Sequence, residues 1–191
     1  MKTLNQYIQE KLIINKDYRD NVIVVKSFDE LRKIIEDRYD KLGPGTKQIP
    51  IDFNDIDVSN IDSFCNSKDE GIFQETKFKY IDISDWDVSN VTNMVAMFFR
   101  CEELKSVGDI SEWDVSNVTD MGSMFFRCEK LESIGDISNW DVSNVAVMSY
   151  MFEFCKKFNQ DISNWDVSKV RYKIDMFDKC PIKNEYKPKF K

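Results

Sequence analysis

The sequence predicts an α/β repeat solenoid, in which coils of one short strand and one short helix stack behind a small α/β N-terminal cap. A stretch of about sixteen residues recurs with few changes along the second half of the chain. The copies are "WDVSNVTNMVAMFFRC" from Trp86, "WDVSNVTDMGSMFFRC" from Trp113, "WDVSNVAVMSYMFEFC" from Trp140 and a weaker "WDVSKVRYKIDMFDKC" from Trp165. The tryptophans are 27, 27 and 25 residues apart. A period of this size is typical of one supersecondary unit stacked on itself.

Residues 1–50 do not repeat, and their pattern predicts helix, strand and helix in that order. Apolar residues at helical spacing follow Leu4, and the run Asn21–Lys26 is rich in valine and isoleucine, as in a strand. Ser27 and Glu30 form a capping box for a second helix, which Gly43 and the proline after it should end.

Three segments follow from these patterns. We predict an N-terminal cap at 1–50, the repeats at 51–180 and a basic tail at 181–191, with the regular copies beginning at 79. Stacked repeats leave an apolar end that a unit of different sequence must cover. A separate domain with its own task is the competing interpretation of 1–50. The segment Gln48–Cys65 contains an imperfect first copy, whose alignment the sequence leaves open.

Within each regular copy, apolar residues follow the tryptophan at offsets of eight, eleven, twelve and fifteen. In the first copy these are Met94, Met97, Phe98 and Cys101, which would share one face of a helix. The preceding "DIS" segment predicts a strand, with a bend before the tryptophan. Stacking would then place equivalent side chains in buried ladders, rather than in a ligand-binding strip or a disulfide framework. The ladder residues are Trp86, Trp113, Trp140, Trp165, Cys101, Cys128, Cys155 and Cys180.

Two aspartate positions also recur in every copy, for example at Asp82 and Asp87. Stacked carboxylates repel one another unless a cation or hydrogen-bond donors compensate. Calcium between coils is one possibility, and acceptance of backbone amides within each turn is the other. The glycine-rich nonapeptide of calcium-binding coils is absent, so we favour the amides and expect no metal and no cofactor.

Composition argues against several classes of function. The chain has no histidine, phosphate-binding loop, dinucleotide fingerprint or nucleophile elbow, so we expect no enzyme activity. Residues 51–180 carry 13 basic and 25 acidic side chains, which disfavours nucleic acid as a partner. No apolar run is long enough for membrane insertion. The first residues lack the pattern of a secretory signal, which predicts a cytoplasmic location, with the cell surface or a phage particle as alternatives.

The repeat "DISNWDVSNVTxMxxMFxxC" resembles the BspA-type leucine-rich-like repeat of bacterial surface proteins, over roughly residues 79–180. The resemblance implies a right-handed solenoid related to leucine-rich repeats, with a role in adhesion or protein binding. The opening "MKTLNQYIQEKLIINKDY" also resembles the beginnings of phage-encoded proteins of gut Bacteroides.

The function expected from the sequence is a non-catalytic scaffold that binds a protein through the exposed face of its repeats. A basic and aromatic strip within an acidic body would suit an acidic protein partner. Its residues are Phe99, Arg100, Phe126, Arg127, Phe154 and Lys179. The plainer interpretation of this strip is a solvated edge with phenylalanines beneath it. The alternative function is a structural part of a larger assembly, such as a phage particle.

Overall fold

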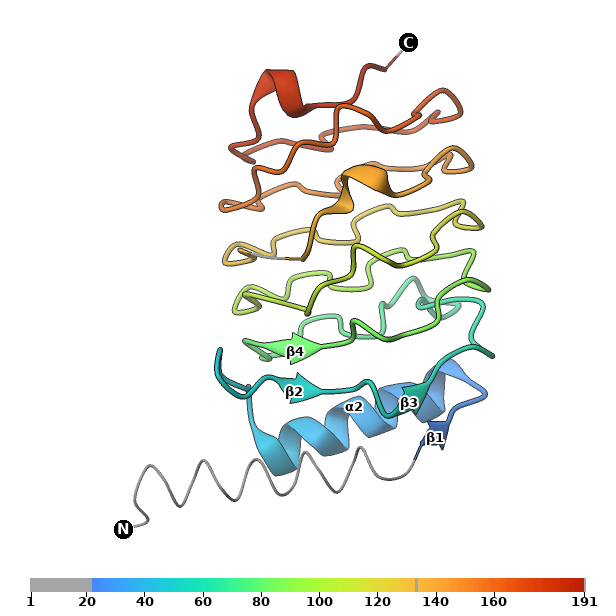
Figure 1. Ribbon diagram of the computed structural model, residues 1–191, viewed down its shortest axis with the longest axis vertical. Coiled ribbons are helices and arrows are strands. Elements are labelled where there is room, and N and C mark those ends of the chain that lie inside the picture. Colours follow the sequence, from blue (N-terminus) through green and yellow to red (C-terminus); the bar gives the residue numbers. More distant parts are fainter. Residues whose placement is uncertain (1–21, 133, 191) are drawn as a thin grey trace.

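The computed structural model places successive repeats on one another as layers of irregular loops, with one helix across the N-terminal end (Figure 1). It describes residues 22–132 and 134–190. Along them the chain forms strand β1 (Ile23–Val24), helix α2 (Phe28–Leu42), and strands β2 (Ile51–Asp52), β3 (Ile56–Asp57) and β4 (Ile81–Asp82). Two single turns of 3-10 helix follow, η1 (Ile137–Asn139) and η2 (Asn184–Tyr186). The helix predicted near Leu4 lies outside the described residues.

The predicted fold class, an α/β repeat solenoid with a strand and a helix in every coil, is wrong. Across residues 22–132 and 134–190 the structure has one α-helix and two short two-stranded parallel sheets, and most of the chain is turns and loops. The repeats themselves contain no α-helix in this described part.

The Met and Phe segments fold into successive tight turns where the sequence predicted helices. Ala96 and Arg100 have left-handed backbone angles, with φ of 55° and 58°. L-residues in that conformation do not continue a right-handed helix. The amide of Met97 donates to the carbonyl of Met94, and that of Cys101 to Phe98, closing turns of four residues. Such turns also bring residues three and four apart to one side, so the apolar spacing is shared by both structures.

The pairing of the short strands aligns the first, imperfect repeat. In one parallel sheet β2 pairs with β4, with Ile51 opposite Ile81, and in the other β1 pairs with β3. The bridge between Ser63 and Asn93 has the same offset of thirty residues. Ile56 therefore occupies the position of the later tryptophans. Parallel bridges then continue from Asn93 through Asp120 and Val147 to Tyr172, and they tie each layer to the next.

Along the wall of Met and Phe turns, alternate backbone amides from Met94 onward donate in one direction, to the following layer. The amides of Ala96, Phe98 and Arg100 donate to carbonyls of the following layer, at 3.0, 2.9 and 2.7 Å. Equivalent amides do the same in the next two layers. Each layer thus presents carbonyl groups toward the N-terminal end of the stack and amide groups toward the C-terminal end.

The core runs through the centre of the stack and consists of repeated side chains from successive layers. The rings of Phe98, Phe125 and Phe152 stack at centroid distances of 5.3 and 5.6 Å. Trp113 and Trp140 are parallel at 6.4 Å. No single layer could bury these rings alone, which explains why the same residues recur at each level.

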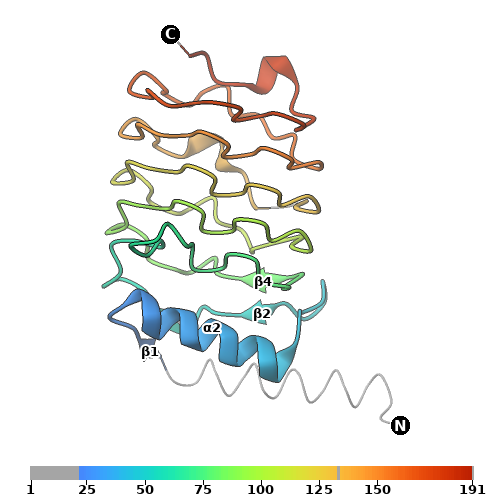
Figure 2. The ribbon, with the colours of Figure 1, turned by 180° about the vertical axis from the view of Figure 1, so that it is seen from behind.

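Helix α2 lies against the first layer and closes the N-terminal end of the stack (Figure 2). The Ser27 hydroxyl accepts from the amide of Glu30 as predicted, whereas the Glu30 carboxylate accepts from the amide of Lys26. Gly43, with φ of 73°, ends the helix. The buried Arg38 guanidinium makes a two-pronged ion pair with Asp55 at 2.7 and 2.6 Å. The helix is thereby fixed to the first layer by an ionic as well as an apolar contact.

Candidate functional site

The six residues predicted as a binding strip form one column along an edge of the stack, here called the cation–aromatic column. They are Phe99, Arg100, Phe126, Arg127, Phe154 and Lys179. The rings of Phe99 and Phe126 stack with centroids 4.9 Å apart and planes 12° apart. Phe154 meets Phe126 edge to face at 6.1 Å. The repeat therefore places aromatic side chains from three layers in contact.

Two cations lie over these rings. The Arg127 guanidinium is 4.7 Å from the centre of the Phe154 ring and 5.7 Å from that of Phe126. The Lys179 ammonium is 4.4 Å from the same Phe154 ring. Arg100 instead pairs with Glu75 of the first layer at 3.4 Å. Contacts of this kind hold cations in place while leaving them available to an anionic partner.

The backbone fixes the positions of the cations. Arg100, Arg127 and Lys179 all have left-handed backbone angles, with φ of 58°, 57° and 52°. The Arg127 amide donates to the carbonyl of Glu153 in the next layer at 2.9 Å. The side chains of Arg100 and Lys179 remain 46% and 60% exposed, so these charges face solvent.

Acidic side chains flank the column at its C-terminal end. The pKa of Glu153 is raised, mainly by partial burial and then by the charges of Asp175 and Asp178. Lys179 also pairs with Asp178 at 3.3 Å. Because Arg100 is likewise paired with Glu75, an acidic partner would meet its strongest attraction near Arg127.

The tryptophan and cysteine ladders are internal features of the stack. Trp140 is 4% exposed, and its indole N–H donates to the carbonyl of Ile110 at 3.0 Å. The Cys101 thiol donates to the carbonyl of Phe73 at 2.9 Å. Burial raises the pKa of Cys101 to about 11. A thiol in this environment stays protonated near neutral pH and is a poor nucleophile.

The structure also corrects the place of the first cysteine. Cys65 does not align with the cysteine ladder, because the residue that precedes Cys101 in the stack is Thr76. Its hydroxyl oxygen lies 3.5 Å from the Cys101 sulfur. The Met and Phe wall reveals this, because the Phe73 amide donates to the carbonyl of Met97 and the Phe73 ring stacks on Phe98, an offset of 25 residues where the strands have 30.

Both aspartate positions accept backbone amides, as favoured from the sequence. Asp87 accepts from the amide of Ser89, and Asp136 from that of Ser138, each at 3.0 Å. The pKa of Asp87 is lowered by the Ser89 hydroxyl and then by the Ser89 amide, and that of Asp136 by the Ser138 amide and then by its hydroxyl. Among residues 22–132 and 134–190, no three carboxylate or cysteine side chains gather in a way that could hold a metal ion.

One exposed apolar surface lies outside the predicted binding strip. Tyr172 and Ile174 are 60% and 58% exposed in the last layer, and Tyr150 is 37% exposed in the layer before. The Tyr150 amide donates to the carbonyl of Ile174 at 2.8 Å, so these residues are neighbours. Their positions vary between copies, and that variation was the available signal.

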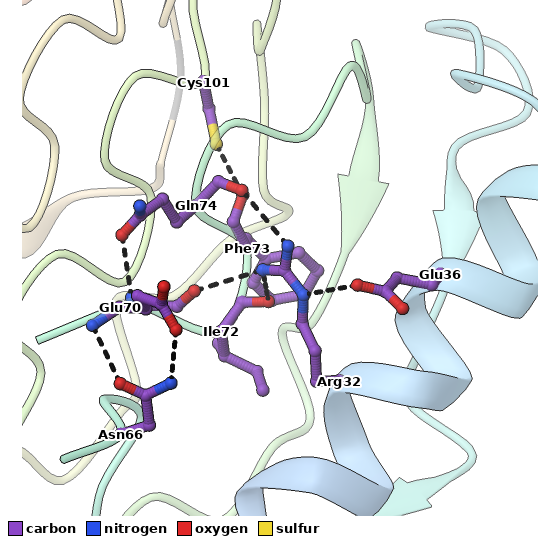
Figure 3. A network of polar contacts seen from close by, with 9 residues as sticks. Arg32, Glu36, Asn66, Glu70, Ile72, Phe73, Gln74 and Cys101 are labelled. Atoms are coloured by element: carbon purple, nitrogen blue, oxygen red, sulfur yellow. Dashed lines mark hydrogen bonds and ion pairs between the residues drawn. The ribbon is translucent and has the colours of Figure 1, made fainter. Parts of the chain in front are cut away.

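A groove of about 460 Å³ lies where α2 meets the first layer. Its walls include Arg32, Glu36, Asn66 and Glu70. The Arg32 side chain spans the groove floor, because it bonds to Glu36 on its own helix and to carbonyls of the first layer (Figure 3). Arg32 is therefore already committed to a structural contact.

Comparison with known proteins identifies a family but no individual relative. No curated protein matches the chain, and no solved structure matches it.

Within the described part of the chain, no helix has the length and hydrophobicity needed to cross a membrane.

A family model matches over residues 51–189, and its description is "Mycoplasma protein of unknown function, DUF285". This finding overturns the assignment to BspA-type leucine-rich-like repeats and to phage or Bacteroides proteins, because neither the BspA nor the leucine-rich repeat family matches. The short shared motif was not enough to distinguish one repeat family from another. Since the matched residues cover well over half of its length, the chain belongs to the family described as Mycoplasma protein of unknown function, DUF285.

Proposed function

We propose that this protein is a non-catalytic binding protein that holds an acidic protein partner on its cation–aromatic column. The observation that carries the proposal is the placement of Arg127 over the rings of both Phe126 and Phe154. Arginine and aromatic residues contribute most to binding energy in protein interfaces, especially where they are held in place before binding.

The charge distribution supports an acidic partner. The body of the stack is acidic, whereas the column presents Arg100, Arg127 and Lys179 on one edge, with Phe154 between the last two. A basic strip in an acidic surface favours one orientation of an acidic partner and repels others. The strip is also held by backbone bonds between layers, so little order must be gained on binding.

A catalytic role has less support. Histidine is absent from the whole sequence, and Cys128 and Cys155 are buried with their pKa raised well above the ordinary value by that burial. The remaining carboxylates that recur in each layer are engaged with backbone amides two residues further on. These groups maintain the turns of the stack.

In the test, three forms of the full chain are immobilised, and the proteins that each form captures are compared. The forms are the wild type, Arg100→Ala/Arg127→Ala, and the control Lys130→Ala/Lys156→Ala, which removes two exposed cations that pair with glutamates elsewhere on the stack. We expect an acidic protein captured by the wild type and the control to be lost from the column variant, with its affinity falling at least tenfold.

Equal thermal stability of the three forms shows that folding is not the cause. If the column variant and the wild type capture the acidic protein equally, the proposal is contradicted. If the protein instead captures components of a particle or of a cell-surface assembly, and does so through a surface other than the column, a structural role is favoured.

A further inference from the structure

Arg127 has no anionic partner in the described part of the chain. Its guanidinium lies over the rings of Phe126 and Phe154, and it donates to no oxygen of the described residues. The side chain is half-buried, yet none of its nitrogens is sealed from solvent. A guanidinium carries five N–H donors, which only water or a ligand can satisfy here. Arg127 is therefore a cation held in position for an acceptor that the described residues do not supply.

The first position of the column holds an acid instead of a cation. Glu75, Arg100 and Arg127 are equivalent residues of successive layers, and their φ angles are 58°, 58° and 57°. The Glu75 amide donates to the carbonyl of Phe99 just as the Arg100 amide donates to that of Phe126, at 2.8 and 2.7 Å. The Glu75 carboxylate pairs with Arg100 at 3.4 Å. A ligand carboxylate must therefore compete with Glu75 for Arg100.

Carboxylates also lie on the other side of Arg127. The Arg127 amide donates to the carbonyl of Glu153, whose carboxylate interacts with the Arg127 charge without forming an ion pair with it. Asp175 and Asp178 lie close enough to Glu153 for their negative charges to act on it. Asp178 pairs with Lys179 at 3.3 Å. Arg127 thus lies between two acidic ends of the same column.

These two ends limit how many acidic residues a ligand can lay along the column. Adjacent layers are about 4.8 Å apart, so Glu75 lies about 10 Å from Arg127 along the stack and Glu153 about 5 Å from it on the other side. One residue of an extended chain spans about 3.3 Å. A run of more than about three acidic residues would place a carboxylate against Glu75 or Glu153. Repulsion between like charges disfavours such a ligand.

The rings beside Arg127 favour apolar neighbours for the carboxylate that it binds. Phe99, Phe126 and Phe154 are half-buried, so each ring is partly open to solvent. Phe126 contacts both of the other rings, at centroid distances of 4.9 and 6.1 Å. Apolar side chains of a partner would remove this aromatic surface from water. They would also shield the ion pair at Arg127 and so strengthen it.

We propose that the column accepts one carboxylate side chain of its partner at Arg127, set between apolar side chains, and that Glu75 and Glu153 exclude runs of acidic residues. The inference rests on the proposed function, because it names the partner chemistry of the same site. The planar guanidinium can donate two parallel hydrogen bonds to one carboxylate. A single glutamate or aspartate in an apolar surface therefore fits the column better than a polyacidic segment.

The test uses the full chain and three labelled peptides with amidated ends. One has a single glutamate between leucine and phenylalanine, the second has glutamine at that position, and the third is hexaglutamate. We expect fluorescence anisotropy to show the single-glutamate peptide bound at least tenfold more tightly than its glutamine analogue. Its affinity should exceed that of hexaglutamate at least fivefold. Arg127→Gln should remove the advantage over the glutamine analogue.

A second set of variants tests the exclusion of acidic runs. Glu75→Gln/Glu153→Gln should raise the affinity for hexaglutamate at least fivefold and so remove its disadvantage. The control Glu112→Gln/Glu132→Gln removes the same charge from exposed residues outside the column and should leave the order of affinities unchanged. Equal thermal stability of the variants and the wild type excludes unfolding as the cause of any difference.

The outcomes separate this inference from the proposed function. If the wild type binds hexaglutamate through Arg127 as tightly as the single-glutamate peptide, the inference is wrong and the proposed function stands. The same holds if Glu75→Gln/Glu153→Gln binds hexaglutamate no better than the control. If neither acidic peptide binds at millimolar concentration, or if Arg127→Gln leaves binding unchanged, the proposed function is contradicted as well.

Discussion

The indole N–H of Trp140 donates to the carbonyl of Ile110 in the preceding layer, at 3.0 Å. The tryptophans of the other layers make the same bond, to Phe53, Ile83 and Ile137. Each of these carbonyls also accepts a backbone amide, so each tryptophan adds a second hydrogen bond to the preceding layer as well as filling the core. This double role explains why no other aromatic residue replaces tryptophan in the regular copies.

Replacement of Trp140 by phenylalanine should lower the free energy of unfolding by about 2–4 kcal/mol. The change removes buried volume and one of the two donors to the Ile110 carbonyl, which keeps its bond from the Trp113 amide at 3.3 Å. Urea denaturation followed by circular dichroism measures the loss. Trp113→Phe is the matched control, because its bond to Ile83 is longer, at 3.3 Å, and it should cost less. Unchanged stability in Trp140→Phe would show that the indole bond contributes nothing.

The ion pair between Arg38 and Asp55 predicts a strong dependence of stability on both partners. Each side chain is 1% exposed, so Arg38→Met leaves a buried carboxylate without its cation. We expect unfolding free energy to fall by about 3–5 kcal/mol. Arg38→Met/Asp55→Leu should recover part of this loss, whereas Lys33→Met on the exposed face of α2 should have little effect. A single variant as stable as the wild type would contradict the prediction.

The buried thiols predict a loss of stability in alkali. Burial raises the pKa of Cys101 to about 11, above the value near 8.5 expected in the unfolded chain. The folded state therefore holds the proton more tightly, and its advantage is complete below about pH 8.5 and lost as the pH rises toward 11. Denaturation midpoints at several pH values measure this slope. Cys101→Ala/Cys128→Ala/Cys155→Ala should show a shallower decline than the wild type, and equal slopes would disprove the assignment.

The left-handed backbone at Ser123 predicts opposite effects for two substitutions. Its φ is 56°, which glycine adopts without steric cost and a β-branched residue strongly disfavours. Ser123→Gly should retain stability or raise it by up to about 1 kcal/mol, since relief of strain exceeds the extra entropy of the unfolded chain. Ser123→Val should lower it by about 1–2 kcal/mol. Thermal melts compare the two, and a more stable valine variant would rule out this backbone strain.

The sequence was informative about burial and much less so about backbone. Trp140, Met97 and Phe98 are buried as the repeat spacing predicted. Helix α2 was also predicted, because Ser27 and Gly43 mark its ends with residues that suit those backbone positions. The helices expected within each repeat are absent from the described residues, because apolar spacing of three and four does not distinguish a helix from successive tight turns.

The column was predicted from the recurrence of its residues alone, but two other features of the structure could not be predicted from the sequence. The pairing of Arg38 with Asp55 depends on where α2 packs, and the spacing of these residues gives no sign of it. The amides of Asp175 and Phe177, which donate to no acceptor in the described part of the chain, belong to backbone geometry, so no side-chain pattern reveals them. The ion pair and the amides both lie at the ends of the stack, so they depend on which layer is first and which is last.

The single direction of hydrogen bonding along the wall of Met and Phe turns has a consequence for how such a chain can change in length. Every internal layer accepts on one side and donates on the other, so a gene duplication that adds one whole copy creates a layer compatible with both neighbours. The helical end around Arg32 and the open end at Lys179 would remain as they are. Lengthening by whole copies would enlarge the column stepwise and leave the two ends unaltered.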